Sequence, residues 1–164
     1  MSQQALLDET DPTNLTCMQR GHLAELVFMR KATGLGFSVS KPWGEGERYD
    51  VIVRVGSTFW RVQVKSVLAK PPSRNYYRIK TSGGTGTRGL TPYSATEIDF
   101  LVAYIFPENL WYVFPASLIE GRKTICVSPR SNRSRFEQYR EAWKLMKPVH
   151  EAAAESAPNP MNEI

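Results

Sequence analysis

Apolar and polar residues recur along the chain with two periods, one typical of helices and one typical of strands. Thr16, followed three residues later by Gln19, matches a capping box, so a first helix is expected to begin there. Gly34 and Gly36 are expected to end this helix. Its inward stripe consists of small and apolar residues at helical spacing, namely Cys17, Gly21, Ala24, Phe28 and Ala32.

A second helical stripe near the end of the chain predicts a final helix over residues 135–146. Either Asn132 or Ser134 is expected to cap its N-terminus. The residues expected to face inward are Phe136, Tyr139, Ala142, Trp143 and Met146.

Two runs between these helices, 48–55 and 58–67, alternate at every second residue and predict a pair of strands. Gly56 and Ser57 separate the runs, and glycine at the first position of a two-residue loop is typical of a type II′ hairpin turn. Further strands are expected at 37–40, 76–80, 99–106, 110–114 and 124–127. The pattern therefore predicts a helix, several antiparallel strands and a final helix.

The hairpin turn sets the pairing between the two strands. With residues 56–57 as the turn, Asp50 lies opposite Gln63, and opposed side chains on one face have Cβ atoms about 4.5–5.5 Å apart. Lys65 lies two residues further along on the same face. A carboxylate, an amide and an ammonium are therefore expected to converge. The alternative is a half-exposed hairpin whose outer face is simply polar.

Such a set of groups is suited to phosphodiester hydrolysis. Asp50 and Gln63 can offer oxygen ligands to a hard divalent cation such as Mg²⁺, for which Mn²⁺ can substitute. Lys65 can orient the attacking water or offset charge that develops on the phosphate oxygens. Glu25, at the edge of the first helix's buried stripe, is the expected fourth member, and its carboxylate needs a partner such as Lys65 or a metal-bound water.

Charge is distributed unevenly along the chain. The net formal charge is +5, but residues 16–147 hold all 21 lysines and arginines and 10 of the 16 acids, so this part carries +11. The remaining acids are Asp8, Glu9, Asp11, Glu151, Glu155 and Glu163. So basic a body favours a polyanionic partner, most commonly nucleic acid. A basic protein with no such partner is the alternative.

The segment 70–88 combines basic residues with tyrosines and a Gly-Thr-rich loop. It follows Lys65 directly, so it is expected to lie beside the scissile phosphate, where a two-stranded ribbon can enter the major groove of double-stranded DNA. A solvated hairpin is the alternative. The candidate DNA-binding residues are Lys70, Arg74, Arg78, Lys80 and Arg88.

The ends of the chain differ from its body. Residues 1–15 are expected to form a flexible arm and 148–164 a disordered tail, which leaves a single domain over 16–147. No apolar run is long enough to cross a bilayer and no signal-peptide pattern is present, so a cytoplasmic location and reduced thiols at Cys17 and Cys126 are expected. His22 is expected to point away from Glu25, and no role is assigned to it.

The order of these motifs resembles a known family. Gly21-x-x-x-Glu25 on a helix, then Tyr49-Asp50, a hairpin and Gln63-Val64-Lys65 resemble the PD-(D/E)XK nuclease superfamily, and most of all its branch with the bacterial group I intron homing endonuclease. The resemblance runs from residue 21 to residue 129 and is more specific than the D-x(12)-Q-x-K motif alone. It implies an α/β, restriction-endonuclease-like core, in which a mixed sheet is flanked by helices and carries Glu25, Asp50, Gln63 and Lys65 as its site.

One position departs from the superfamily pattern, which usually has Glu or Asp where this chain has Gln63. The homing branch is similar in having glutamine there. Three interpretations stay open: a Mg²⁺-dependent endonuclease that cuts double-stranded DNA, a DNA-binding protein of the same fold without activity, and a junction resolvase or repair nuclease. Because a chain this small needs partners to cut both strands, a homodimer or homotetramer is expected.

Overall fold

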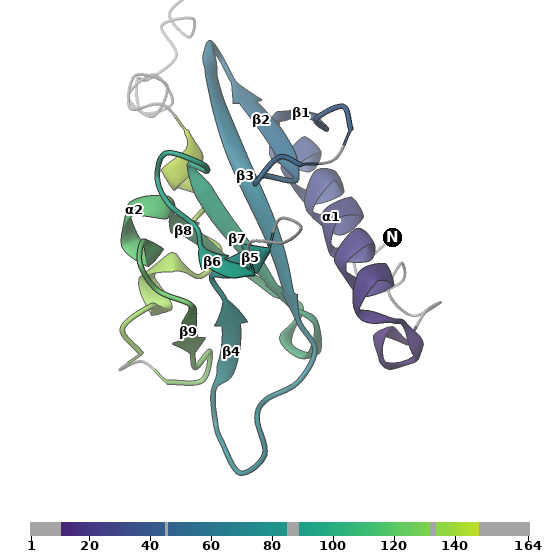
Figure 1. The fold of residues 1–164 in the computed structure, drawn as a ribbon, viewed down its shortest axis with the longest axis vertical. Coiled ribbons are helices and arrows are strands. Elements are labelled where there is room, and N and C mark those ends of the chain that lie inside the picture. The colour runs from purple at the N-terminus through teal and green to yellow at the C-terminus, as the bar shows by residue number, and fades with distance from the viewer. Residues whose placement is uncertain (1–10, 45, 85–88, 132–133, 148–164) are drawn as a thin grey trace, which may run out of the picture.

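A five-stranded mixed sheet forms the centre of the molecule (Figure 1). The computed structural model describes residues 11–44, 46–84, 89–131 and 134–147. The strands lie in the order β1-β2-β3-β7-β8, and only β3 and β7 run parallel to each other. Their bounds are β1 Ser38–Ser40, β2 Val51–Val55, β3 Thr58–Val67, β7 Phe100–Ile105 and β8 Leu110–Pro115.

The helix α1 (Cys17–Gly34) covers one face of this sheet, and its start is the one predicted. The Thr16 hydroxyl accepts a hydrogen bond from the Gln19 N–H at 3.2 Å, and the Gln19 side chain accepts one from the Thr16 N–H at 2.9 Å. This capping box satisfies two backbone donors that the first turn leaves open. Ala24, Phe28 and Ala32 are fully buried against the sheet, as the helical stripe predicted.

Smaller elements cover the opposite face of the sheet (Figure 1). The strands β4 (Tyr77–Lys80) and β9 (Thr124–Val127) pair with each other, and β5 (Ser82–Gly84) pairs with β6 (Leu90–Pro92). The short helix α2 (Ala116–Ile119) follows β8. Each face of the sheet thus has its own apolar core, one under α1 and one under the β4–β9 pair. Two 3₁₀ helices, η2 (Pro12–Asn14) and η4 (Phe106–Glu108), complete the connections.

The parallel pairing of β3 with β7 makes the sheet mixed, as the family resemblance implied, although the alternation pattern alone predicted antiparallel strands. Parallel neighbours need a long crossover, and the segment between these two strands supplies it with β4, β5 and β6. Every residue of β7 is buried. A continuous apolar strand of this kind is typical of a central position covered on both faces, and its sequence does not show the direction of its neighbour.

The predicted final helix over 135–146 is wrong. The structure has two short 3₁₀ helices instead, η5 (Glu137–Tyr139) and η6 (Trp143–Met146). Between them the chain docks on the outer edge of β8, where the Glu141 N–H donates to the Trp111 carbonyl at 2.9 Å and the Glu141 carboxylate accepts from the Trp111 N–H at 2.8 Å. The unpaired backbone of the edge strand therefore competes with the helix for these hydrogen bonds.

Several expectations about the ends and the surface can be compared with this fold. In the part of the chain that the structure describes, no helix is long and apolar enough to span a membrane. Cys17 and Cys126 are exposed free thiols. Residues 1–10 of the predicted arm and the predicted tail, 148–164, lie outside the described residues, whereas residues 12–14 of the arm form η2.

Candidate active site

The β2–β3 hairpin places Asp50 against Gln63, as its register predicted. Val55 pairs with Thr58 across the turn, and Gly56 has the positive φ of 57° that a type II′ turn requires. The ladder continues outward to Val51 and Val62. The Asp50 N–H then donates to the Val62 carbonyl at 2.9 Å, and the Asp50 carboxylate accepts hydrogen bonds from the Val64 N–H at 2.8 Å and from the Gln63 amide.

The Asp50 carboxyl has an unusual proton affinity. Burial raises its pKa to about 6, because the charged form loses its hydration, and the negative charge of Glu25 acts in the same direction. The hydrogen bond from Val64 and the positive charges of Lys65 and Lys41 act in the opposite direction and lower the pKa. Asp50 thus lies within the electrostatic reach of both other charged members of the predicted site.

Gln63 is buried, with 6% of its surface exposed. Its amide nitrogen donates to Asp50 and, at 3.1 Å, to the Val64 carbonyl, so the nitrogen rather than the oxygen faces the carboxylate. An amide oxygen can reach a cation beside Asp50 only after the amide group turns over. The assignment of Gln63 as a metal ligand therefore stays a prediction.

Lys65 lies over an aromatic ring that comes from a distant part of the chain. Its Nζ is 5.2 Å from the centre of the Tyr93 ring, and the guanidinium of Arg48 lies 4.4 Å from the centre of the same ring. Tyr93 is 3% exposed. A cation over an aromatic ring is attracted by the ring's electrons and keeps its charge, so Tyr93 supports Lys65 without neutralising it.

A cavity of about 300 Å³ lies where α1 meets the segment that leads into β2. Glu25 and Asp50 both line it, so the structure brings these two predicted residues together across 25 positions of sequence. Gln63 and Lys65 are not among the described residues that line the cavity. Gln63 is hydrogen-bonded to Asp50, and the Lys65 ammonium lies over the Tyr93 ring. In the structure the Glu25 carboxylate pairs with Lys41, whereas the sequence suggested Lys65 or a metal-bound water as its partner. The described lining residues are His22, Glu25, Lys41, Pro42, Gly44, Gly46, Glu47, Tyr49 and Asp50.

The sequence motifs did not point to three charged or titratable residues that line this cavity, namely His22, Lys41 and Glu47. His22 was expected to point away from Glu25, but residues three apart on a helix are neighbours, so their spacing already placed them together. Lys41 directly follows the strand predicted at 37–40, and no motif assigns it a role. Nothing local in the sequence connects Lys41 with Glu25, because the ion pair depends on how β1 packs against α1.

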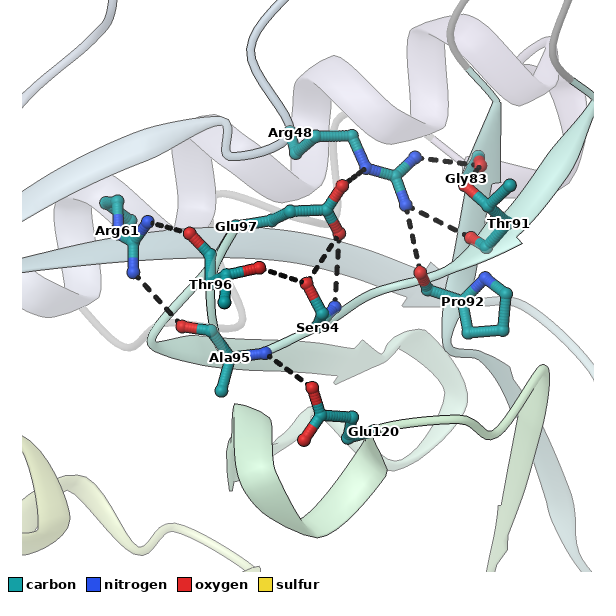
Figure 2. A network of polar contacts seen from close by, with 10 residues as sticks. All are labelled: Arg48, Arg61, Gly83, Thr91, Pro92, Ser94, Ala95, Thr96, Glu97 and Glu120. Atoms are coloured by element: carbon teal, nitrogen blue, oxygen red, sulfur yellow. Dashed lines mark hydrogen bonds and ion pairs between the residues drawn. The ribbon is translucent and has the colours of Figure 1, made fainter.

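Two arginines join the strands of the site to the loop that supplies Tyr93 (Figure 2). The Arg48 guanidinium donates to the Gly83 carbonyl at 2.8 Å and to the Thr91 carbonyl at 3.1 Å, and its Nε lies 3.3 Å from the Glu97 carboxylate. Arg61 donates to the Thr96 and Ala95 carbonyls at 2.6 and 3.3 Å. It also pairs with Asp99 at 2.9 Å. These contacts hold Gly83 and residues 91–97 beside the site.

The predicted DNA-binding residues have different surroundings. Arg74, Arg78 and Lys80 are exposed, and the last two lie on the outer side of β4, whose Tyr77 and Ile79 face inward. Lys70 is half-buried, hydrogen-bonded to Asn75 at 3.1 Å. Arg88 lies outside the described residues. The strand of this segment pairs with β9 rather than folding back on itself, so the ribbon that carries Arg78 and Lys80 is made with a segment far along the chain.

The oxygen atoms around the cavity fit a hard divalent cation with few protein ligands. Among the described residues, no group of three or more His, Cys, Asp or Glu side chains gathers around one point. Three carboxylates line the cavity, those of Glu25, Glu47 and Asp50, and Gln63 adjoins Asp50. Mg²⁺ keeps several of its waters and is often held by one or two carboxylates, so this donor set suits it.

A mixed sheet with α1 on one face, and with a carboxylate and a lysine at the β2–β3 edge, defines a protein of the restriction-endonuclease-like fold. The chain belongs to the PD-(D/E)XK endonuclease family, whose model matches residues 16–146. The family and the fold class that the sequence motifs indicated are both confirmed.

Comparison with solved structures gives a similar result. The chain is similar to the bacterial homing endonuclease I-Ssp6803I, with 28% identity and a TM-score of 0.71 over 88% of this chain and 100% of that one. The Holliday junction resolvase Hjc of Archaeoglobus fulgidus matches at 17% identity and a TM-score of 0.44, over 82% of this chain and 96% of that one. A match this distant carries no argument about activity. No curated protein sequence matches the chain significantly.

Proposed function

We propose that this protein is an endonuclease that uses Mg²⁺, or Mn²⁺ in its place, to hydrolyse phosphodiester bonds of double-stranded DNA. The observation that carries the proposal is the half-buried carboxylate of Asp50, which lines one cavity with Glu25 and lies within the electrostatic reach of Lys65. Membership of an endonuclease family and the likeness to a homing endonuclease support it. Recognition of one DNA site, as in a homing enzyme, is part of the proposal.

Each residue has a defined task in this proposal. A divalent cation held by Glu25 and Asp50, with Gln63 as a further ligand, supplies Lewis acidity and a water of lowered pKa. The Val64 N–H holds the Asp50 carboxylate in one orientation. Lys65, supported by Tyr93, keeps a positive charge where negative charge grows on the phosphate oxygens.

The basic surface supplies the affinity for DNA in this proposal. Residues 16–147 carry +11, and Arg74, Arg78 and Lys80 are exposed close along the chain to Lys65. Binding that neutralises several phosphates releases counterions, so affinity should fall steeply with salt. A plot of log affinity against log salt, measured by fluorescence anisotropy on a duplex, checks this. A flat plot contradicts electrostatic binding by these residues.

Cutting both strands of a duplex needs two active sites in opposite orientations, so the proposal includes a symmetric homodimer or homotetramer in the cytoplasm. Analytical ultracentrifugation of the full chain, with and without DNA, tests this part. A monomer under both conditions would leave the protein able only to nick.

A second candidate function is DNA binding without cleavage. The Gln63 amide nitrogen, and not a carboxylate, faces Asp50, and this observation favours it. Incubation of supercoiled plasmid with the full chain, with Mg²⁺ and with EDTA, separates the two functions. Nicked or linear product that depends on Mg²⁺ supports the endonuclease. Binding without product in Mg²⁺ or Mn²⁺ supports the second candidate.

A further inference from the structure

Lys41 lies directly after β1 and reaches the cavity that Glu25 and Asp50 share. Its ammonium forms an ion pair with Oε2 of Glu25, in which the Lys41 side chain is 49% exposed and that of Glu25 is 15% exposed. Its charge also acts on Asp50, whose pKa it lowers. A single ammonium therefore interacts with Glu25 and Asp50, two of the three carboxylates that line the cavity, the third being Glu47.

Two carboxylates that share a partly enclosed cavity repel each other unless a cation lies near them. A divalent ion held by Glu25 and Asp50 would remove this repulsion. Lys41 lines the same cavity and already contacts Oε2 of Glu25. An ammonium and a divalent ion cannot both contact the same carboxylate oxygen without strong repulsion between them. Metal binding through Oε2 of Glu25 therefore requires Lys41 to leave.

We propose that Lys41 is a placeholder cation, which holds Glu25 in position before the metal binds and competes with the metal for the Glu25 carboxylate. The proposal rests on the proposed function, since it concerns the metal that the nuclease would use. Lys41 is a positioning residue in it, because it acts on the site through Glu25.

The surroundings of Lys41 allow it to leave. Its side chain is half exposed, on a flexible four-carbon stem, and an ion pair at such a site contributes little stability. The segment after it contains Gly44 and Gly46, with φ of 82° and 122°, and neither has another atom within 4 Å of where a Cβ would lie. No packed side chain at these two glycines holds the segment against α1.

The test is the affinity for Mn²⁺ without DNA, measured by calorimetry on the wild-type chain and on Lys41→Met. If Lys41 competes with the metal, its removal should tighten Mn²⁺ binding about fivefold, which corresponds to about 1 kcal/mol. Lys41→Arg keeps the ion pair and should bind Mn²⁺ as the wild type does. A lysine with a merely structural role predicts the opposite sign, because loss of the pair would leave Glu25 less ordered and weaken binding.

The matched control is Lys31→Met, which removes a comparable ion pair between Lys31 and Glu141, 3.4 Å long and not among the groups that line the cavity. Its Mn²⁺ affinity should equal that of the wild type. Thermal melting in EDTA checks that each variant is folded, which is expected since Lys41 is half exposed.

A double-mutant cycle separates direct competition from general repulsion between Lys41 and the metal. In a Glu25→Gln background the ion pair is already gone, so Lys41→Met should change the Mn²⁺ affinity by less than about twofold if the competition acts through Glu25. An undiminished fivefold effect in that background overturns the proposal. The proposal is also overturned if Lys41→Met binds Mn²⁺ with the same affinity as the wild type or with a lower affinity. If one of these two contrary results is found but the wild type nicks plasmid with Mg²⁺, only the inference about Lys41 fails. If the wild type neither binds Mn²⁺ nor nicks plasmid, the proposed function itself fails.

Discussion

The two ends of the β2–β3 hairpin have the same alternating pattern but opposite surroundings. At the turn end, Arg54 pairs with Phe59, and both are exposed, Phe59 to 62%. At the other end, Gln63 is 6% exposed and Asp50 is mostly buried. Residues 91–97, which Arg48 and Arg61 hold in place, lie beside the site end, where Tyr93 contacts Lys65.

This difference separates a polar strand face that is in contact with water from one whose polar groups contact one another. At the turn end, water satisfies the outer face, so the identity of each side chain matters little. At the site end, the polar groups have lost water and must satisfy one another, as Asp50 does with Gln63 and Val64. The same loss of water raises the pKa of Asp50.

The largest expected contrast between the two ends is in catalysis. Asp50→Ala and Lys65→Ala should each lower the cleavage rate at least about 100-fold, because in the proposed function one removes a metal ligand and the other a charge beside the phosphate. Their DNA affinity should stay within about tenfold of wild type. Plasmid nicking and anisotropy measure the two effects. Phe59→Ala, at the turn end, is the control and should cut as the wild type does; equal rates for all of these proteins contradict the site assignment.

Substitution of Gln63 tests whether it binds metal or only pairs with Asp50. Gln63→Leu should raise the Mg²⁺ concentration needed for cleavage or stop it. Gln63→Glu places a second carboxylate beside Asp50, so it should destabilise the protein in EDTA at neutral pH by like-charge repulsion. Mg²⁺ should restore stability by linkage, more at higher concentration. Melting temperatures at several Mg²⁺ concentrations decide this; a Gln63→Glu variant that Mg²⁺ does not stabilise argues against a metal ligand at this position.

The raised pKa of Asp50 predicts a pH effect that the turn end lacks. The folded protein, with a pKa of about 6, holds the proton more tightly than the unfolded chain, with the ordinary value of 3.8. Stability should therefore fall as pH rises from about 4 to about 7, relative to Asp50→Asn, and the difference should be constant above about pH 7. Thermal melts of both proteins in EDTA across this range measure it. A difference that does not change with pH shows that the carboxyl titrates normally.

The smallest predicted effect concerns the loop that covers the site end. A Cβ on Gly83 would lie 2.3 Å from the Tyr93 hydroxyl, so Gly83→Ala should displace Tyr93 and destabilise the fold by about 1–3 kcal/mol. Cleavage should fall with it, since Tyr93 supports Lys65. Gly21→Ala is the matched control, because nothing lies within 4 Å of its Cβ and alanine favours a helix. If Gly83→Ala melts and cuts as the wild type does, Tyr93 does not support the site.

The sequence determined the elements whose information is local. The capping box of Thr16 and Gln19 placed the start of α1, because both partners lie within one turn. Gly56 and Ser57 set the hairpin register and thereby the contact of Asp50 with Gln63, because a two-residue turn leaves no freedom in the pairing. The resemblance to the family then supplied the mixed sheet.

Only the tertiary structure decided the contacts between distant segments. Alternation gives a strand its two faces but neither its neighbour nor its direction, so the parallel pairing of β3 with β7 and the pairing of β4 with β9 were not visible in the sequence. The predicted last helix does not form, because Glu141 in this segment hydrogen-bonds to the backbone at the outer edge of β8. The ion pair of Lys41 with Glu25 likewise forms because β1 packs against α1, and no local pattern records that contact.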